Sequence, residues 1–544
     1  MRKNHLLLLL LFFTAFTVNA KDVNILNYGA VPDGKTLSTK AIQQAIDECS
    51  QSGGGDVIIP AGTYLTGTIY LKNDVLLNLG KGATLLGSTD MKDYAPNALV
   101  RAEHQKNIGI TGHGVIDGQG PTFWEMKKTP NKTTFGMNPA WNFAHKASVS
   151  GNLVLLEDCR FVNIENVTLR NSESWTLHLL ACDDVKVHGI TIRNPQHGPN
   201  TDGIDLNGSR RVMISDCDIY TNDDAICLKN KDPRYWKRCC EDITVTNCVI
   251  TTSCNAFKIG TETIGDFRNI VFSNSVIKAG DPENELSVLA AKQVLPGNYG
   301  DILSPRSGIA LETVDGANVS HVNINNIVME ARIPIFIRVG NRGRKGDKSD
   351  PNSVPGTMKD VIISNITAYN ASTTSSITGL PGYDVENVRI SNLIIRTKGG
   401  GDKMLAEKKL DEAEKEYPNG TMWGPIPASG IYVRHVKDLE IKDAEIVLDE
   451  ADQRPLMIFD DVEGLCLNNL KTNDFHKGES IMSFTNVQHA GLFYNDFSNG
   501  NLPNWYSFSG NKTKDIVIFA PGTGAAEAHL KTDNTVAKGS IRTK

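Results

Sequence analysis

Three aspartates near the middle of the chain have the types and spacing that most strongly suggest chemistry. Asp202 lies in the run NTDGIDL, and the pair Asp223 and Asp224 lies in the run NDDAICLK further on. Each run leads into a short apolar strand, so the two carboxylate clusters should face each other if the strands stack. Close carboxylates repel one another, which raises the pKa of at least one. Acid–base cleavage of a glycosidic bond requires one protonated and one ionised carboxyl group.

The same residues also have more ordinary uses. Asp-Gly and Asn-Asp are common turn residues, and the corners of a repeating fold are rich in them. Turns do not require two adjacent acids aligned with a third, however. A calcium site would need further oxygen ligands, and few flank the aspartates. No Cys/His spacing indicates a metal site either, so we expect no metal and no cofactor.

Short strands that recur along most of the chain must position these acids. Units of the form Asn/Asp-Val/Ile-x-Ile/Val begin, for example, at Asn166, Asp242, Asn269 and Asp360. They recur at intervals of about 20 to 30 residues, which is typical of solenoids. The pattern predicts an all-β fold, a single-stranded right-handed parallel β-helix in which asparagines form ladders at the turns.

Two segments depart from the strand pattern. Residues 38–50 place apolar side chains at helical spacing and predict an N-terminal helix that caps the first coil. The apolar face of this helix would contain Ala41, Ile42, Ala45, Ile46 and Cys49. Residues 403–417, rich in Glu, Lys, Leu and Ala, predict a short helix inserted between later coils. We expect a leader over residues 1–20, a β-helix over 21–500 and a cap or tail over 501–544.

The leader has the form of a secretory signal. Arg2 and Lys3 precede an apolar run, and Val18-Asn19-Ala20 resembles a cleavage site. The run is too short to span a membrane, and no other segment is long and apolar enough. We therefore expect an exported protein, periplasmic or extracellular, without a membrane span.

Net charge and cysteine spacing argue against two further classes of protein, nucleic-acid-binding proteins and small disulfide-stabilised scaffolds. The formal net charge of −6 argues against nucleic acid as a partner. The 10 cysteines lack the spacing of a small disulfide scaffold. Cys217 and Cys248 occupy matching places in successive repeats and should stack in the interior as small hydrophobic residues. We expect a monomer.

The runs NTDGIDL and NDDAICLK, with NYGAVPDGKTL near the N-terminus, resemble glycoside hydrolase family 28, the polygalacturonase family. The resemblance covers about Asn24 to Glu463. It implies a pectin-lyase-like β-helix that hydrolyses galacturonate-containing chains with inversion. By this resemblance Asp223 is the general acid. Asp202 and Asp224 bind and activate the attacking water, and Asn200 orients the carboxylates.

Other residues are candidate contacts for the pectic substrate. The candidates for substrate binding are His178, Asn200, Lys229, Lys258 and Arg338. A buried, satisfied histidine is an equally good interpretation of His178. Two basic clusters suit an anionic sugar, Lys229, Lys231, Arg234, Lys237 and Arg238 in the first and Arg338, Arg342, Arg344 and Lys345 in the second. The first cluster beyond Lys229 is equally well explained as a solvated loop. Aromatic residues that would stack on sugars or pack internally are Trp175, Tyr235, Trp236 and Trp423.

Two motifs of the family are missing. The family's Gly-His-Gly is replaced by Ser253-Cys254-Asn255, and its Arg-Ile-Lys by a segment that ends at Glu312 and has neither cation. Such cations bind a carboxylate by charge-assisted hydrogen bonds, whereas a glutamate repels it. We therefore expect galacturonate linked to a neutral sugar, as in rhamnogalacturonan or branched pectic oligosaccharides. Arg338 would then hold the galacturonate that is released.

Four alternatives stay open. An exo-polygalacturonase on homogalacturonan and an α-L-rhamnosidase would use the same site. A pectate lyase would need calcium and a basic residue as the base. A non-catalytic carbohydrate-binding β-helix would gain nothing from three repelling carboxylates. Insertions around residues 281–306 and 343–355 would favour exo action if they wall off the cleft.

Overall fold

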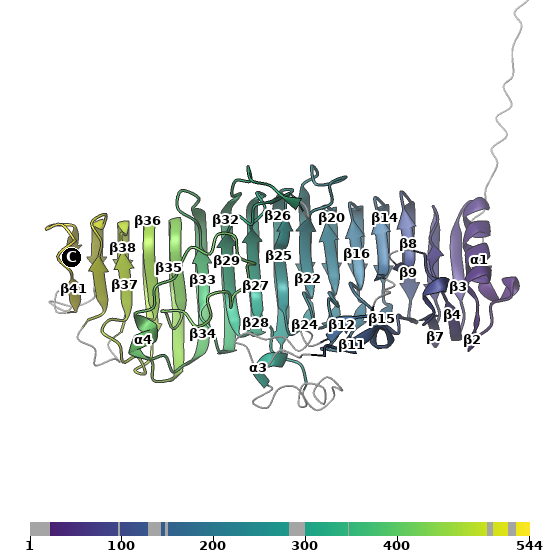
Figure 1. Cartoon of the computed structure of the whole chain (residues 1–544), viewed down its shortest axis with the longest axis horizontal. Helices are drawn as coiled ribbons and strands as arrows, with labels where there is room; N and C mark the ends of the chain where they lie inside the picture. Colours follow the sequence, from purple (N-terminus) through teal and green to yellow (C-terminus); the bar gives the residue numbers. More distant parts are fainter. Residues whose placement is uncertain are drawn as a thin grey trace, which may run out of the picture.

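The computed structural model describes residues 22–95, 98–128, 143–146, 151–281, 300–345, 348–497, 504–519 and 529–544. The predicted leader lies outside these residues. Strands stack along one long axis from α1 (Thr39–Gln51) at one end to the C-terminal strands at the other (Figure 1). Successive coils pair in parallel and form three long sheets. This arrangement confirms the predicted right-handed parallel β-helix.

Sheet 1 carries the aspartates at the start of its strands. Its strands are β5 (Ile69–Tyr70), β8 (Ala98–Glu103), β13 (Asn152–Glu157), β16 (Leu177–Leu180), β19 (Ile204–Asn207), β22 (Ile226–Asn230), β25 (Asn255–Thr263), β27 (Ser307–Thr313), β29 (Ile333–Val339) and β33 (Ser375–Thr378). It continues through the first parts of β35 (Ile431–Glu450) and β36 (Met457–Thr472) to β37 (Met482–Thr485), β39 (Tyr506–Ser509) and β41 (Leu530–Thr532).

Sheet 2 follows sheet 1 in each coil. Its strands are β1 (Val23–Asn24), β3 (Gly55–Ile59), β6 (Val75–Leu79), β9 (Lys106–Gly112), β14 (Arg160–Glu165), β17 (Asp183–His188), β20 (Arg210–Ser215), β23 (Cys240–Thr246), β26 (Phe267–Lys278), β28 (Asn318–Glu330), β32 (Thr357–Ala371) and β34 (Val385–Gly399). It continues through β35 and β36 to β38 (Gln488–Phe493), β40 (Lys514–Phe519) and β42 (Ile541–Thr543).

Sheet 3 closes each coil with short strands. These are β2 (Asp33–Leu37), β4 (Gly62–Thr66), β7 (Ala83–Gly87), β10 (Val115–Asp117), β15 (Thr168–Arg170), β18 (Thr191–Arg193), β21 (Asp218–Tyr220) and β24 (Val249–Thr251), followed by the ends of the long strands from β26 onward. Two small antiparallel pairs lie outside the helix, β11 (Trp124–Met126) with β12 (Phe143–His145) and β30 (Arg344–Lys345) with β31 (Lys348–Ser349).

The core is a set of apolar ladders inside the coils. Leu177, Ile204, Ile226 and Phe257 are register partners on successive strands of sheet 1, and all four are fully buried. Strands alternate inward and outward side chains, so one buried residue per coil extends each ladder. Burial of a side chain of this size contributes about 1.5–3 kcal/mol. These ladders fix the register, and the register fixes which polar residues share the outer face.

Asparagine and aspartate turn the chain at the corners. Asn274, Asn326, Asn365 and Asn392 have positive φ. Each of the last three donates to the asparagine of the preceding coil, over 3.0, 3.0 and 2.7 Å. These residues tolerate the left-handed conformation better than other side chains. The predicted asparagine ladders are confirmed.

Buried cysteines contribute to the interior. Cys217 and Cys248 are free thiols within the core, as predicted, and Cys239 and Cys240 are also unpaired with any other cysteine of the described chain.

No helix among the described residues is long and apolar enough to cross a bilayer.

The predicted capping helix is confirmed. Helix α1 buries Ala41, Ile42, Ala45, Ile46 and Cys49 against the first coil. In Figure 1 it covers the N-terminal end of the stack, where it blunts the sheet edge.

Two other sequence predictions need correction. Only Lys403–Ala406 (α4) is helical within the expected helix 403–417. The carbonyls of Leu410, Glu412 and Ala413 accept hydrogen bonds from arginine side chains of the β-helix, and Ala413 has a φ of 45°. The β-helix also does not end at residue 500, because β39 to β42 continue the parallel pairing.

Candidate active site

The three aspartates meet where the chain passes from sheet 3 into sheet 1. Asp202 and Asp224 each stand two residues before a register partner, Ile204 or Ile226, so they are neighbours on adjacent coils. The Gly203 amide donates to the Asp224 carbonyl over 2.9 Å and fixes this alignment. Asp223 lies in the turn before Asp224, and its Oδ1 accepts the Asp224 amide at 2.9 Å. The expected juxtaposition of the two clusters is therefore present.

Asp224 is held in its ionised form. Burial alone would raise its pKa, but the Lys258 ammonium lies 3.1 Å away and the Asn255 amide donates to it over 2.5 Å. With Lys229 nearby, these partners keep the pKa of Asp224 well below its usual range. Asn255 stands on the coil where the family motif has histidine. It is a site residue that the sequence analysis noted only as part of a replaced motif.

Asp223 has the opposite electrostatic tendency. Burial and the adjacent Asp224 carboxylate raise its pKa, and the nearby Lys258 and Arg306 offset this only in part. One oxygen each of Asp223 and Asp224 lies within 4.8 Å of the Cys254 sulfur. Two neighbouring carboxyl groups with pKa values displaced in opposite directions are the arrangement that acid and base roles require.

Asp202 belongs to a second buried group on the adjacent coil. The Lys229 ammonium lies 3.4 Å from Asp202 and 3.4 Å from Asp205, and 3.7 Å from Glu262. Burial, together with repulsion from neighbouring acids, raises the pKa of Asp202, and burial raises that of Asp205 to about 7. One lysine therefore faces three carboxyl groups, and the two most buried, Asp202 and Asp205, have raised pKa values.

Asp205 was missed by the sequence analysis, where it was read as part of an apolar strand. Its carboxyl group is fully buried, and neither oxygen has a hydrogen-bond partner within the described residues. An aspartate inside an otherwise apolar run was the available signal, since a charge is seldom buried without a purpose.

Glu312 is a further buried acid beside the cluster. Its carboxylate lies 4.0 Å from Lys258, and burial raises its pKa to about 7. It is 1 % exposed. Glu312 therefore influences the site electrostatically, through Lys258, and does not form part of an exposed surface that a substrate would contact.

The loop of residues 231–238 covers sheet 1 on the N-terminal side of the aspartates. Tyr235 packs on Ala98, Leu155 and Leu180, and its hydroxyl donates to Glu157 over 3.1 Å. Within the same loop, Arg234 pairs with Glu157 and Asp232, and Arg238 pairs with Asp183. Two of the five cations of the first basic cluster, Arg234 and Arg238, therefore fix the loop to the β-helix. We call this segment the N-side cover.

A second cover comes from residues 403–425, between β34 and β35. Met422 and Trp423 pack on the outward side chains Ala310, Ile333 and Phe336. The Thr261 hydroxyl donates to that of Tyr417 over 2.9 Å, and the Tyr417 ring lies 6.0 Å from the Lys258 ammonium. This C-side cover hides the outer face of β27 and β29. The coils of the aspartates lie between the two covers, and Asp202 and Asp224 are each 3% exposed there.

Arg338 does not join the aspartates. It is 2 % exposed and donates to the carbonyls of Glu412 over 2.5 Å and Gly379 over 3.3 Å. Its guanidinium also lies 5.2 Å from the Trp423 ring. Arg338 therefore anchors the C-side cover, which corrects its expected position on the active face. Trp423 is a packing residue for the same reason.

Of the remaining predicted substrate contacts, two lie among the carboxylates and two lie beside them. Lys229 and Lys258 lie among the carboxylates. Asn200 is exposed, with a φ of 53°, in the turn before Asp202. His178 is the register partner of Asp205, but it is buried against Trp175 with ring centroids 4.8 Å apart. Burial and nearby lysines lower the pKa of His178 to about 3, so it is neutral.

Paired carboxyl groups are the groups that glycoside hydrolysis requires. A model of the family "Glycosyl hydrolases family 28" matches residues 49–233, a stretch that includes all three aspartates. Over this stretch the chain is similar to that family, whose members are glycoside hydrolases.

Individual proteins show the same similarity. A probable polygalacturonase from Vitis vinifera is 24% identical over 421 residues, which is 72% of this chain and 78% of the relative. An exo-poly-alpha-D-galacturonosidase from Dickeya chrysanthemi is 31% identical over 262 residues, 39% of this chain and 42% of that protein. The chain thus spans less than half of the Dickeya relative. The structure of a family 28 exopolygalacturonase from Yersinia enterocolitica superposes with a TM-score of 0.57 at 20% identity, covering 87% of this chain and 78% of that one, and supports the fold.

Proposed function

We propose that this protein is an exported, inverting hydrolase that releases galacturonate from the end of a pectic chain in which the next sugar is neutral. The observation that carries this proposal is a carboxylate cluster enclosed between two covers, with its buried cations already paired. The names of the relatives, which include polygalacturonases and an exo-poly-alpha-D-galacturonosidase, support a galacturonate-containing substrate.

The proposed mechanism divides the work among the three aspartates. Asp223, whose raised pKa favours the protonated form, donates its proton to the leaving oxygen. Asp224, kept ionised by Lys258, accepts a proton from water on the opposite face of the sugar. Asp202 holds that water in place. Because water attacks directly, the anomeric centre inverts.

Action at a chain end follows from the two covers. A polysaccharide bound in the middle must lie across both ends of its cleft, along several coils of sheet 1. The N-side cover rests on Leu155 and Leu180, and the C-side cover rests on Ala310 and Phe336. Covers on both sides shorten the part of sheet 1 that a substrate can occupy. We infer that a chain end fits between them better than a continuous strand of polymer does.

Charge supports a neutral sugar on the leaving side. Lys229 and Lys258 are nearly fully buried and contact enzyme carboxylates, and Arg306 donates to Cys254 over 2.8 Å. The carboxylate of a second uronate would therefore be repelled by the enzyme's acids, because these cations are already paired and cannot bind it. Lys231 is the half-buried exception, 5.5 Å from the Trp175 ring. We assign the carboxylate of the released galacturonate to Lys231, in place of Arg338.

The test compares specificity constants on digalacturonate and on a galacturonate–rhamnose disaccharide or its longer homologue. A charge-assisted hydrogen bond contributes roughly 1.5–3 kcal/mol, so its absence should favour the neutral leaving sugar by about 10- to 150-fold. Lys231→Gln should raise KM on both substrates, whereas Lys237→Gln, in the exposed part of the same loop, should not. Single galacturonates should be the first products from longer chains.

Faster cleavage of digalacturonate would restore the exo-polygalacturonase alternative. Release of a terminal rhamnose from a rhamnose–galacturonate substrate would support an α-L-rhamnosidase instead. Early production of mid-sized oligosaccharides would contradict action at chain ends, because these require binding across both covers.

The role of Lys258 gives a pH-dependent prediction. Lys258→Met should raise the pKa of Asp224, because burial remains while the counter-charge is lost. Asp224 must be ionised to act as the base, so the acid limb of the kcat/KM profile should move to higher pH. The profile of Lys231→Met should keep its acid limb. An unchanged limb in the Lys258 variant, with folding verified by circular dichroism, would remove Asp224 from the role of base.

A further inference from the structure

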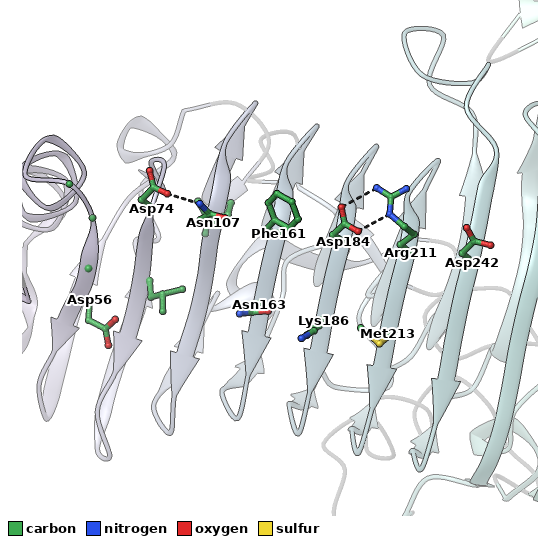
Figure 2. A pocket seen from close by; sticks show the side chains of 15 residues that line it. Asp56, Asp74, Asn107, Phe161, Asn163, Asp184, Lys186, Arg211, Met213 and Asp242 are labelled. Carbon is green, nitrogen blue, oxygen red and sulfur yellow. Dashed lines mark hydrogen bonds and ion pairs between the residues drawn. The ribbon is translucent and has the colours of Figure 1, made fainter. Parts of the chain in front are cut away.

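A groove on sheet 2 lies apart from the aspartates. It has a volume of about 880 Å³ and crosses the outer face of the strands from β3 to β23. Figure 2 shows Asp74, Asn107, Phe161, Asp184 and Arg211 in one row along it, with Asn163, Lys186 and Met213 in a second row. Seven strands at ~4.8 Å spacing give a length of roughly 30 Å, which suits an extended chain better than a single small molecule.

Phe161 is the residue in this groove that the fold does not explain. At the start of the sheet 2 strands the backbone is left-handed in each coil, with φ of 53° at Asn107, 55° at Phe161, 57° at Asp184 and 53° at Arg211. Asparagine and aspartate adopt this conformation at little cost, whereas a bulky aromatic residue is an outlier there.

The neighbours of Phe161 gain hydrogen bonds from this geometry. Asn107 donates to Asp74 over 2.7 Å, and Arg211 donates to Asp184 over 2.7 and 3.0 Å. Figure 2 shows these bonds on either side of Phe161. A phenyl ring cannot extend such a ladder, so Phe161 interrupts it.

The ring is also exposed. Phe161 is 57% exposed, and Met213 in the second row is 49% exposed. Gly109, the register partner of Asn163, leaves the second row without a side chain beside Phe161. A strained backbone and an exposed apolar ring are both unfavourable in the free protein. Such features persist at binding sites, where an aromatic face stacks on a ligand.

Charge selects the class of ligand. Four aspartates line the groove against two cations, and one of these cations, Arg211, is already paired with Asp184. This surplus of acids repels a polyuronate. Carboxylates and asparagine amides, however, form good hydrogen bonds with sugar hydroxyls, and an aromatic ring suits the apolar face of a pyranose.

We propose that this groove is a second, non-catalytic site that binds a neutral polysaccharide chain, with Phe161 as its stacking platform. The site rests on sheet 2 and does not depend on the function proposed for the aspartates. A neutral chain held there would keep the enzyme on a mixed polysaccharide while the aspartates on sheet 1 act on acidic chain ends, as proposed above.

The test uses the full chain in affinity electrophoresis and calorimetry with soluble neutral galactan, and with polygalacturonate as the acidic comparison. The variant Phe161→Asn restores the residue type that fits the corner. It should weaken galactan binding by about 2- to 13-fold, the change that corresponds to an aromatic contact of about 0.5–1.5 kcal/mol. It should melt at the same temperature as the parent or higher, because the strain is relieved. Turnover of short soluble substrates should not change.

The matched control is Tyr494→Asn. Tyr494 is also aromatic, has a φ of 51° and is 52% exposed, but it lies at the end of β38 and contacts Phe519 with ring centroids 5.1 Å apart. The Tyr494→Asn variant should bind galactan as tightly as the parent protein does. Absence of galactan binding by the parent protein would overturn the proposal. So would galactan binding that survives Phe161→Asn, loss of stability in that variant, or polygalacturonate binding that depends on Phe161.

Discussion

Asp223→Asn should lower kcat by about 10²–10⁴ while leaving the fold intact. The side chain keeps its size, and its Oδ1 can still accept the Asp224 amide that it accepts at 2.9 Å. What is lost is the proton that the leaving oxygen needs. Steady-state kinetics on a galacturonate-containing oligosaccharide, together with thermal melting, would measure both parts of this expectation.

A matched control is available on the same stretch of chain. Asp216→Asn changes a carboxylate in an exposed turn, where the partner is His188 at 3.2 Å. It should leave kcat unchanged within about two-fold, because surface ion pairs contribute little. If Asp223→Asn retained near-parental turnover, the proton donor would have to be another group.

The pair Asp202 and Asp224 should behave as one unit. Asp202→Asn and Asp224→Asn should each reduce kcat/KM by about 10²–10⁴, because each removes part of the group that holds and activates water. The double variant should be only slightly worse than the poorer single variant, since residues that share one task have strongly non-additive effects. The measurement is a double-mutant cycle on kcat/KM.

Stability measurements separate this effect from damage to the fold. Asp224→Asn leaves Lys258 with a weakened partner in a buried site, and loss of one member of a buried ion pair costs about 3–5 kcal/mol. Urea denaturation of each variant would show whether enough folded protein remains for the kinetic comparison. Full additivity in well-folded variants would mean that Asp202 and Asp224 perform separate tasks.

The fold could be predicted because its signals are local and repeated. The strand units, the corner asparagines and the amphipathic pattern from Ala41 to Cys49 each recur or act within a short window. The juxtaposition of Asp202 with Asp224 follows from coil length alone. Asn255 and Asp205 could not be assigned roles in this way, because their importance depends on which side chains the register places beside them.

Long-range contacts explain the predictions that were wrong. Arg338 ends a strand of sheet 1, as expected, but a segment that follows β34 crosses over it and provides carbonyl acceptors. The same contacts replace the helical hydrogen bonds expected in residues 407–417. Neither effect can be predicted from the local sequence, because each depends on how the inserted segment runs across several coils.

The position of the C-side cover in the chain has a consequence for biosynthesis. Repeat folds can form coil by coil, because each coil depends mainly on its neighbours, and chains fold from the N-terminus as they leave the ribosome. The coils from β16 to β25 can therefore assemble before residues 403–425 are synthesised. A nascent or truncated chain that stops before this segment would hold its aspartates on a face open toward β27 and β29. Under the proposed function, the catalytic aspartates are encoded early and the segment that restricts the site to chain ends is added late, so the two can be altered separately.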